Sequence, residues 1–327
     1  MIAFLIKLPF QSLKEIKMRS KNNISLVGYT GFVGSNIFAS GKIDFGYNSK
    51  NIADAFGTNP DILIYAGLRA EKFLANVAPE KDFALIKQAE DNIKQINPKH
   101  LVLISTIDVL KNPSGKDETS EIETEGLLPY GLNRFRLEQW ARENYPDCLI
   151  VRLPGLYGIN LKKNFIYDFM NIVPSMLKAP KFEELSAKEP ELLKYYSLQN
   201  NGFYKLGQVS ETDREELKER FQMLDFTALN FTDSRNVYQF YPLSRLFDDI
   251  HLALGNGIKL FHPATEPVSA SELYTFLTVK SFCNEISSSP CFYDFRTKYA
   301  EFFGGRNGYI MKKEEVLEDI KKFVGVK

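Results

Sequence analysis

The sequence contains few of the residues that bind metals or form disulfides. Its 327 residues include three histidines and three cysteines, and neither set has the spacing of a metal site. The cysteines, Cys148, Cys283 and Cys291, indicate no disulfide framework, which is typical of a reducing compartment. We therefore expect a cytoplasmic protein without a bound metal.

The sequence also has no excess of charge of one sign. Lysine and arginine number 41, aspartate and glutamate also number 41, and the formal net charge is +0. A chain without a global positive field is a poor candidate for general nucleic-acid binding. Hydrophobic residues make up 44% of the chain and charged residues 25%, which predicts a globular protein with a sizeable core.

A hydrophobic run long enough to cross a bilayer is absent as well. The first ten residues are largely apolar, but a membrane-spanning helix needs about 20 such residues. Lys7 interrupts the stretch, an arrangement that does not suit a signal peptide. We expect no membrane association. We interpret residues 1–20 as an N-terminal extension or an artefact of an upstream start site, with a short amphipathic surface helix as the alternative.

The first half of the chain alternates strand-like and helix-like segments. Four apolar runs, and a less clear one within residues 43–47, predict strands: 24–27, 61–66, 100–105 and 148–153. Helical patterns lie between them at 79–95 and 129–145. This alternation predicts an α/β fold of the Rossmann type, a doubly wound parallel sheet with helices on both faces. The first two units are short for a full Rossmann repeat.

A glycine-rich turn joins the first predicted strand to a helix. Gly28 lets the chain turn sharply, Gly31 lets a pyrophosphate approach the backbone, and Gly34 lets the helix pack on the sheet. Phosphates would bind the N–H groups at the helix start, where the helix dipole favours negative charge. An ordinary strand-to-helix turn is the alternative. We predict a dinucleotide site that comprises Gly28, Thr30, Gly31, Phe32, Val33 and Gly34.

The spacing Gly-x-x-Gly-x-x-Gly resembles that of the extended short-chain dehydrogenase/reductases, the family of nucleotide-sugar epimerases, dehydratases and reductases. The resemblance covers roughly residues 24–276. It implies hydride transfer between a nicotinamide coenzyme and a sugar carbon of a nucleotide-linked keto sugar, in a protein that forms a homodimer. It is weakest over residues 180–226, where charged helical patterns indicate an insertion in the substrate lobe.

The end of the predicted strand at 100–105 carries the second match to the family. Relatives place a catalytic Ser or Thr here, three residues before a valine, and Thr106 occupies that register. The Thr106 hydroxyl would hold a substrate oxygen beside the nicotinamide. Ser105 is the next candidate, and strand termination is the alternative for both. Asp108 is a candidate for substrate binding, or it caps a turn, and it lacks the acid partner of a dehydratase.

The third match is Tyr130 followed by Arg134. The family motif is Tyr-x-x-x-Lys on a helix, which places both side chains on one face. The tyrosine would transfer the proton, and a neighbouring cation would lower its pKa from about 10. Arg134 keeps the positive charge but is larger and does not place one ammonium group as lysine does. The resemblance implies catalytic and coenzyme-binding roles for Tyr130 and Arg134, whereas a helix-surface pair is the alternative.

Two later segments also resemble the family. The stretch at 151–158 matches an Arg-x-x-x-x-Tyr-Gly pattern but has Gly155 where many relatives carry asparagine. Asn164 then has the place of an asparagine that holds the nucleotide sugar, with helix capping as the alternative. Arg235 has the place of an arginine that binds the substrate diphosphate, and Pro242 replaces the usual aspartate there.

Coenzyme preference depends on the residues after the second strand. NAD enzymes usually carry an acid there for the ribose hydroxyls, but this chain has Asn48, Ser49 and Lys50, which favours NADP over NAD. After the third strand, Ala66 and Gly67 leave room for the coenzyme. Beyond them, Arg69 and Lys72 are candidates to bind a substrate or coenzyme phosphate, and exposure to solvent without such a role is the alternative.

The second half of the chain predicts further elements and the division into domains. The patterns indicate a strand and then a helix at 235–253, a strand at 258–262, and helices at 269–282 and 312–324. We assign residues 21–160, with a return segment near 235–265, to a dinucleotide-binding domain, and residues 161–234 and 266–327 to a substrate lobe. The predicted function is a keto-sugar reductase or epimerase. A non-catalytic protein that binds NAD(P) or a nucleotide sugar is the alternative.

Overall fold

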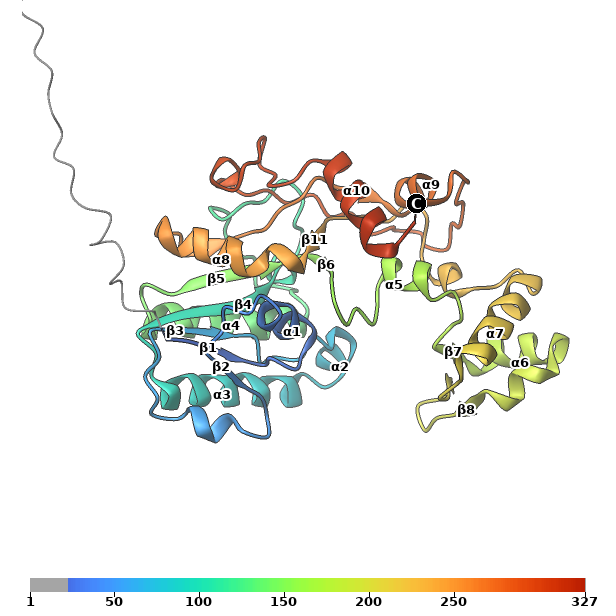
Figure 1. Cartoon of the computed structure of the whole chain (residues 1–327), viewed down its shortest axis with the longest axis horizontal. Helices are drawn as coiled ribbons and strands as arrows, with labels where there is room; N and C mark the ends of the chain where they lie inside the picture. The colour runs from blue at the N-terminus through green and yellow to red at the C-terminus, as the bar shows by residue number, and fades with distance from the viewer. Residues whose placement is uncertain (1–22, 327) are drawn as a thin grey trace, which may run out of the picture.

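A six-stranded parallel sheet lies at the centre of the structure, a computed structural model that describes residues 23–326 (Figure 1). The extension predicted at 1–20 lies outside these residues. The strand order is β12-β5-β4-β3-β1-β2. The strands are β1 (Ile24–Val27), β2 (Phe45–Tyr47), β3 (Ile62–Tyr65), β4 (His100–Thr106), β5 (Leu149–Leu153) and β12 (Leu260–Phe261). The sheet confirms the predicted α/β fold class.

The two faces of the sheet bury alternate side chains of each strand. In β1, Leu26 packs into the core on the side of α1 (Phe32–Phe38) and α8 (Leu246–Gly255). Its neighbour Val27 packs on the opposite side, against α3 (Pro79–Ile96) and α4 (Pro129–Asn144). Because both faces are covered, these strands are apolar throughout, as the sequence pattern indicated.

The first part of the sheet is shorter than a full Rossmann repeat. Only the short 3-10 helix Ile52–Ala55 links β2 to β3, and β2 remains at the edge of the sheet. The order 2-1-3-4-5 reverses between β1 and β3, which is where open α/β sheets bind ligands at the carboxyl ends of their strands. The glycine turn after β1 lies at this position.

The chain returns to the sheet after residue 235 and then forms a C-terminal layer. The strand β6 (Gly155–Tyr157) pairs in parallel with β11 (Phe240–Pro242), and β10 (Val237–Tyr238) pairs antiparallel with β13 (Val268–Ser269). Two helices follow, α9 (Ala270–Thr278) and α10 (Lys313–Val324). The predicted helix at 269–282 is wrong at its end, because Val279 adopts φ 60° and terminates α9.

A small lobe projects from the body between α5 (Phe165–Met170) and residue 231 (Figure 1). Its helices α6 (Ala179–Lys188) and α7 (Glu211–Met223) confirm the predicted helical segment. Sequence reasoning missed its antiparallel sheet of three short strands, β7 (Met176–Lys178), β9 (Phe203–Leu206) and β8 (Tyr196–Leu198). The lobe has a core of its own around Phe182, Leu192 and Phe221.

Within residues 23–326, none of the helices has both the length and the apolar character that a membrane span would need.

Candidate active site

The glycine turn after β1 has no room for side chains. Gly28 has φ +92°, and a Cβ added there would lie 2.4 Å from the carbonyl oxygen of Ala66. A Cβ on Gly34 would lie 2.1 Å from the carbonyl oxygen of Gly28. Helix α1 starts directly after Gly31, which has no side chain to cap the first N–H groups of the helix. At the start of α1 the turn therefore exposes backbone atoms without side chains at Gly28, Gly31 and Gly34.

The end of β2 contains no acidic residue. Asn48 forms a tight turn in which its Oδ1 accepts from the backbone N–H of Lys50 at 2.9 Å and its own N–H donates to Asn51 Oδ1 at 2.8 Å. Ser49 and Lys50 are exposed beside this turn. The structure therefore places Asn48, Ser49 and Lys50 at the carboxyl edge of the sheet, in the turn that follows β2, the strand next to β1.

The loop after β3 passes close to the glycine turn. The Ala66 N–H donates to the carbonyl of Val27 at 2.9 Å, and a Cβ on Gly67 would lie 3.0 Å from the Val27 side chain. The Arg69 side chain is exposed and makes no hydrogen bond or ion pair with any described residue. Lys72, at the start of α2 (Lys72–Val77), instead binds Asp108, with Nζ 2.9 Å from Oδ1.

Thr106 and Tyr130 lie together beyond the carboxyl end of β4. Thr106 is the last residue of β4, and its side chain forms a hydrogen bond with the Tyr130 hydroxyl. The backbone N–H of Tyr130 donates to Asn76 Oδ1 at 2.9 Å, which fixes the start of α4. Gly131 completes the contact, because a Cβ there would lie 2.1 Å from the carbonyl oxygen of Asp108. Sequence reasoning gave no role to Asn76 or to Gly131, which directly follows Tyr130 within the motif.

Arg134 lies next to Tyr130, and its guanidinium also binds Asp82 and the carbonyl of Arg69. Its guanidinium carbon is 4.1 Å from the centre of the Tyr130 ring. The same guanidinium forms an ion pair with Asp82 of α3 and donates to the carbonyl of Arg69 at 2.8 Å. The side chains of Arg134 and Asp82 are 4% and 7% exposed. The positive charge is therefore buried and paired.

These surroundings act on the Tyr130 pKa in opposing directions. Burial raises the pKa, Arg134 lowers it, Asp108 raises it, and the hydrogen bond with Thr106 lowers it. Burial is the largest effect, and the pKa of Tyr130 lies above its ordinary value of 10.0. In the protein alone, Arg134 does not lower the pKa below that value, contrary to the effect that the family motif predicts.

Ser105 points away from this site. Its hydroxyl donates to Glu138 Oε1 at 2.6 Å, inside the core between β4 and α4. Glu138 is fully buried and also accepts from Arg152, with a shortest distance of 2.7 Å. Ser105 thus belongs to a buried polar network, and Thr106 is the hydroxyl that faces the cavity.

A cavity of about 310 Å³ opens beside Thr106 and Asp108. Its walls come from four parts of the chain: the end of β4, the segment after β5, helix α5, and the strands and loop of the C-terminal layer. The polar residues that line it are Thr106, Asp108, Asn164, Asp168, Thr232, Tyr238, Gln239 and Tyr293. Sequence reasoning missed Asp168 and Tyr293, since neither belongs to a motif.

Asn164 lines the cavity and also caps α5. Its Oδ1 accepts from the Tyr167 N–H at 3.1 Å, and its Nδ2 donates to the carbonyl of Leu156 at 2.8 Å. Its φ of 114° is unusual for a residue other than glycine. Asn164 therefore caps the start of α5, which was the alternative to a role in substrate binding.

No protein-family profile matches the sequence, and no curated protein matches it. Solved structures do match over nearly the whole chain. A dTDP-4-dehydrorhamnose reductase from Bacillus anthracis in complex with NADP matches with a TM-score of 0.60 and 15% identity, over 93% of this chain and 98% of that one. A UDP-N-acetylglucosamine 4-epimerase from Methanobrevibacter ruminantium in complex with UDP-N-acetylmuramic acid gives a TM-score of 0.59 and 13% identity, over 93% and 97%.

RMD from Pseudomonas aeruginosa, complexed with NADPH, matches with a TM-score of 0.57 and 13% identity, over 93% of this chain and 97% of that one. The chain shares its fold with these three proteins. At this level of identity the likeness concerns the fold.

Of two departures from the motifs that the sequence resembles, the one at Gly155 has a structural cause. Gly155 replaces an asparagine, and a Cβ at this position would lie 2.9 Å from the carbonyl oxygen of Gln239. The close pairing of β6 with β11 therefore requires a small residue. Pro242 replaces an aspartate at the end of β11, where its register partner is Tyr157 of β6.

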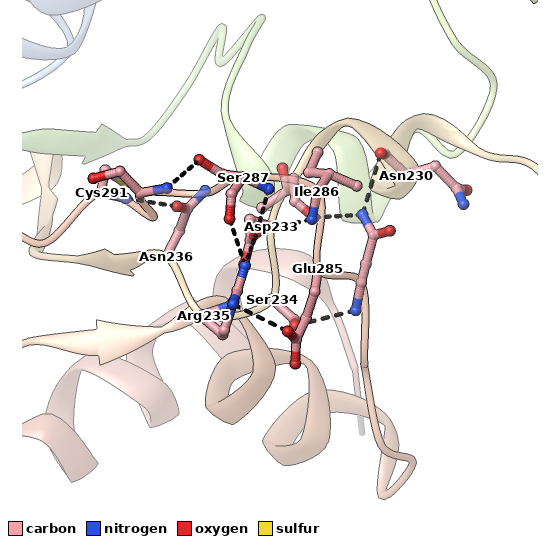
Figure 2. Close-up of polar contacts among 12 residues, drawn as sticks. Asn230, Asp233, Ser234, Arg235, Asn236, Glu285, Ile286, Ser287 and Cys291 are labelled. Atoms are coloured by element: carbon pink, nitrogen blue, oxygen red, sulfur yellow. Dashed lines mark hydrogen bonds and ion pairs between the residues drawn. The ribbon is translucent and has the colours of Figure 1, made fainter.

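Arg235 lies outside the cavity lining and is bound by neighbouring acids (Figure 2). Its guanidinium makes two hydrogen bonds to Asp233, at 2.9 and 2.8 Å, and lies 3.0 Å from a Glu285 oxygen. Asp233 also accepts from the backbone N–H groups of Ile286 and Ser287, both at 2.9 Å. Hydrogen bonding to Arg235 is the main cause that lowers the Asp233 pKa. Arg235 thus helps to hold the loop after α9 against the body.

No group of three or more histidine, cysteine, aspartate or glutamate side chains in residues 23–326 has the arrangement of a metal site.

Proposed function

We propose that this protein is an NAD(P)-dependent enzyme that modifies a nucleotide-linked sugar, as a keto-sugar reductase or an epimerase. The observation that carries the proposal is the meeting of Thr106 and Tyr130 at the carboxyl end of β4, beside a cavity of about 310 Å³. The solved structures that share the fold include a reductase with NADP and an epimerase with a UDP-linked sugar.

The glycine turn fits a dinucleotide. Gly28 and Gly34 leave the backbone bare, and the start of α1 offers N–H groups to a pyrophosphate. Phe32 and Val33 supply the first of these groups, and Thr30 and Gly31 form the exposed turn before them. When bound, the nicotinamide ring would donate or accept a hydride.

The absence of an acid at the end of β2 supports NADP. Lys50 is an exposed cation beside Asn48 and Ser49, and these three side chains suit a 2′-phosphate. An acid at this place would instead accept from ribose hydroxyls and repel the phosphate.

In the proposed reaction, Thr106 holds the substrate oxygen and Tyr130 transfers the proton to or from it. Arg134 stacks on the Tyr130 ring and stabilises the phenolate through its charge, which Asp82 partly offsets. Asp108 and Asn164 lie at the wall of the cavity, where substrate hydroxyl groups would bind. Arg69 is exposed and available to a substrate phosphate, whereas Arg235 would first have to leave Asp233.

The test is turnover by the full-length protein. We would follow nicotinamide absorbance with NADPH or NADH and dTDP- or UDP-linked keto sugars, and sugar interconversion by chromatography for the epimerase. The variant Tyr130→Phe should lower turnover at least about 100-fold while coenzyme binding persists. The control Tyr145→Phe removes a hydroxyl at the other end of α4 and should leave turnover unchanged. Equal turnover by Tyr130→Phe and the wild type would contradict the proposed role.

The second candidate is a non-catalytic protein that binds NAD(P) or a nucleotide sugar. It is favoured by the pairing of Arg134 with Asp82 and by the raised pKa of Tyr130, which together leave the phenolate poorly stabilised. Binding of coenzyme and nucleotide sugar without turnover, in the wild type and in Tyr130→Phe alike, would support this candidate.

We also propose the division of the chain into a dinucleotide-binding domain and a substrate lobe, and a homodimer in the cytoplasm. Light scattering of the purified protein tests the dimer.

A further inference from the structure

Asp168 is a carboxyl group in the cavity that the proposed reaction does not use. It lies one turn after Asn164, the strained residue that starts α5. Phe165 and Ile166, which are 3% and 0% exposed, anchor the same helix in the core. The start of α5 is thereby fixed, and Asp168 is held at the cavity wall.

Asp168 has no partner for its charge. Its side chain makes no hydrogen bond or ion pair with any residue in 23–326, whereas Asp108 across the cavity binds Lys72 and accepts from the Tyr293 hydroxyl at 3.2 Å. None of the residues that line the cavity is lysine, arginine or histidine. Asp168 is half-buried, and a carboxylate withdrawn from water without a partner is costly unless a ligand supplies a donor or a cation.

We propose that Asp168 makes this cavity a sugar subsite that accepts neutral and amino sugars and excludes sugar acids. This inference rests on the proposed function, since it concerns the sugar of a nucleotide-linked substrate. Sugar hydroxyl or ammonium groups would donate to the Asp168 carboxylate. The carboxylate of a uronic acid would instead face the like charge of Asp168 in a cavity whose lining includes no cation, since the neighbouring Lys72 is paired with Asp108. The repulsion between the two carboxylates would exclude the sugar acid.

The selectivity should depend on pH. Burial raises the pKa of Asp168 to about 7. The titratable groups that line the cavity with it are Tyr238 on β10, Tyr293 and Asp108, and Asp108 is paired with Lys72. Above pH 7 the ionised carboxylate repels a sugar acid. Below it the protonated group donates a hydrogen bond and the repulsion is lost, so the exclusion of sugar acids strengthens as pH rises.

The experiment compares two ligands that differ only at C6. Calorimetry on the full-length protein with NADPH would measure binding of UDP-glucose and UDP-glucuronic acid, and of the corresponding dTDP pair. Titrations would be made about one unit below and above the Asp168 pKa of about 7. At the higher pH the wild type should prefer the glucose form at least about tenfold, and at the lower pH the preference should shrink.

The variants assign the effect to this side chain. Asp168→Asn should bring the ratio of affinities close to one and remove its pH dependence, whereas Asp168→Glu should keep the preference. The control Asp147→Asn removes an exposed carboxylate beside Lys259, before β5, and should retain the wild-type ratio. Thermal unfolding shows that each variant is folded.

Two results would overturn the inference. The first leaves the proposed function intact, and the second contradicts the proposed function as well. If both sugars bind with equal affinity at the higher pH, or if Asp168→Asn keeps the preference, the role of Asp168 fails while nucleotide-sugar binding stands. If NADPH binds but none of the nucleotide sugars does, the proposed function fails together with the inference.

Discussion

Replacement of Arg134 by methionine should destabilise the protein by about 3–5 kcal/mol, the cost of leaving a buried charge without its partner. The magnitude follows from the burial of the pair: Arg134 and Asp82 are 4% and 7% exposed, on neighbouring helices. Methionine fills much of the same volume but leaves Asp82, among residues 23–326, with only the side-chain hydrogen bond from Asn133 Nδ2, at 2.9 Å.

A double-mutant cycle separates the pair from simple loss of packing. Asp82→Asn removes the charge and keeps a polar group, so Asp82→Asn combined with Arg134→Met should recover part of the lost stability. The control Lys42→Met breaks an exposed ion pair with Asp248 and should barely change the unfolding midpoint.

Urea unfolding followed by tryptophan fluorescence is the assay, since Trp140 is the single tryptophan of the chain and lies on α4 with Arg134. A loss below about 1 kcal/mol for Arg134→Met, or additive effects in the cycle, would refute the view that the charge of Arg134 is committed to Asp82.

Two further predictions concern the coenzyme. Gly34→Ala should abolish NADPH binding and lower the thermal midpoint, because its Cβ would lie 2.1 Å from the carbonyl oxygen of Gly28. The control is Gly255→Ala at the end of α8, where no atom lies within 4 Å of an added Cβ, and normal binding by Gly34→Ala would contradict the prediction. Lys50→Met should weaken NADPH binding about tenfold and leave NADH binding unchanged, as measured by fluorescence titration. An equal effect on both coenzymes would remove Lys50 from the 2′-phosphate site.

The central sheet could be predicted from sequence because its strands carry a simple signal. A strand that is buried on both faces is apolar throughout, and β1 is confirmed at its predicted bounds, 24–27. The starts of α3 and α4 were predicted correctly at Pro79 and Pro129, since proline is favoured at the first helical position.

The small lobe and the environment of Arg134 could not be predicted in this way. Strands β7, β8 and β9 have three or four residues each and lie among charged helices, so they have no detectable periodicity. The partner of Arg134 lies 52 residues away on another helix, and no local pattern indicates that Asp82 takes up its charge.

Asp168 could not be found from sequence for a related reason. It belongs to no motif, and its character comes from what surrounds it: apolar and phenolic side chains from β10, β11 and the C-terminal loop. The first of these segments, β10, begins 69 residues after Asp168, and all of them meet it only in the folded protein.

Titration of the full-length protein with NADPH and NADH tests the central claim most directly. We predict saturable binding of both coenzymes, tighter for NADPH, with binding lost in Gly34→Ala. Binding of neither coenzyme by the folded protein would contradict the assignment of the turn from Gly28 to Gly34 as a dinucleotide site.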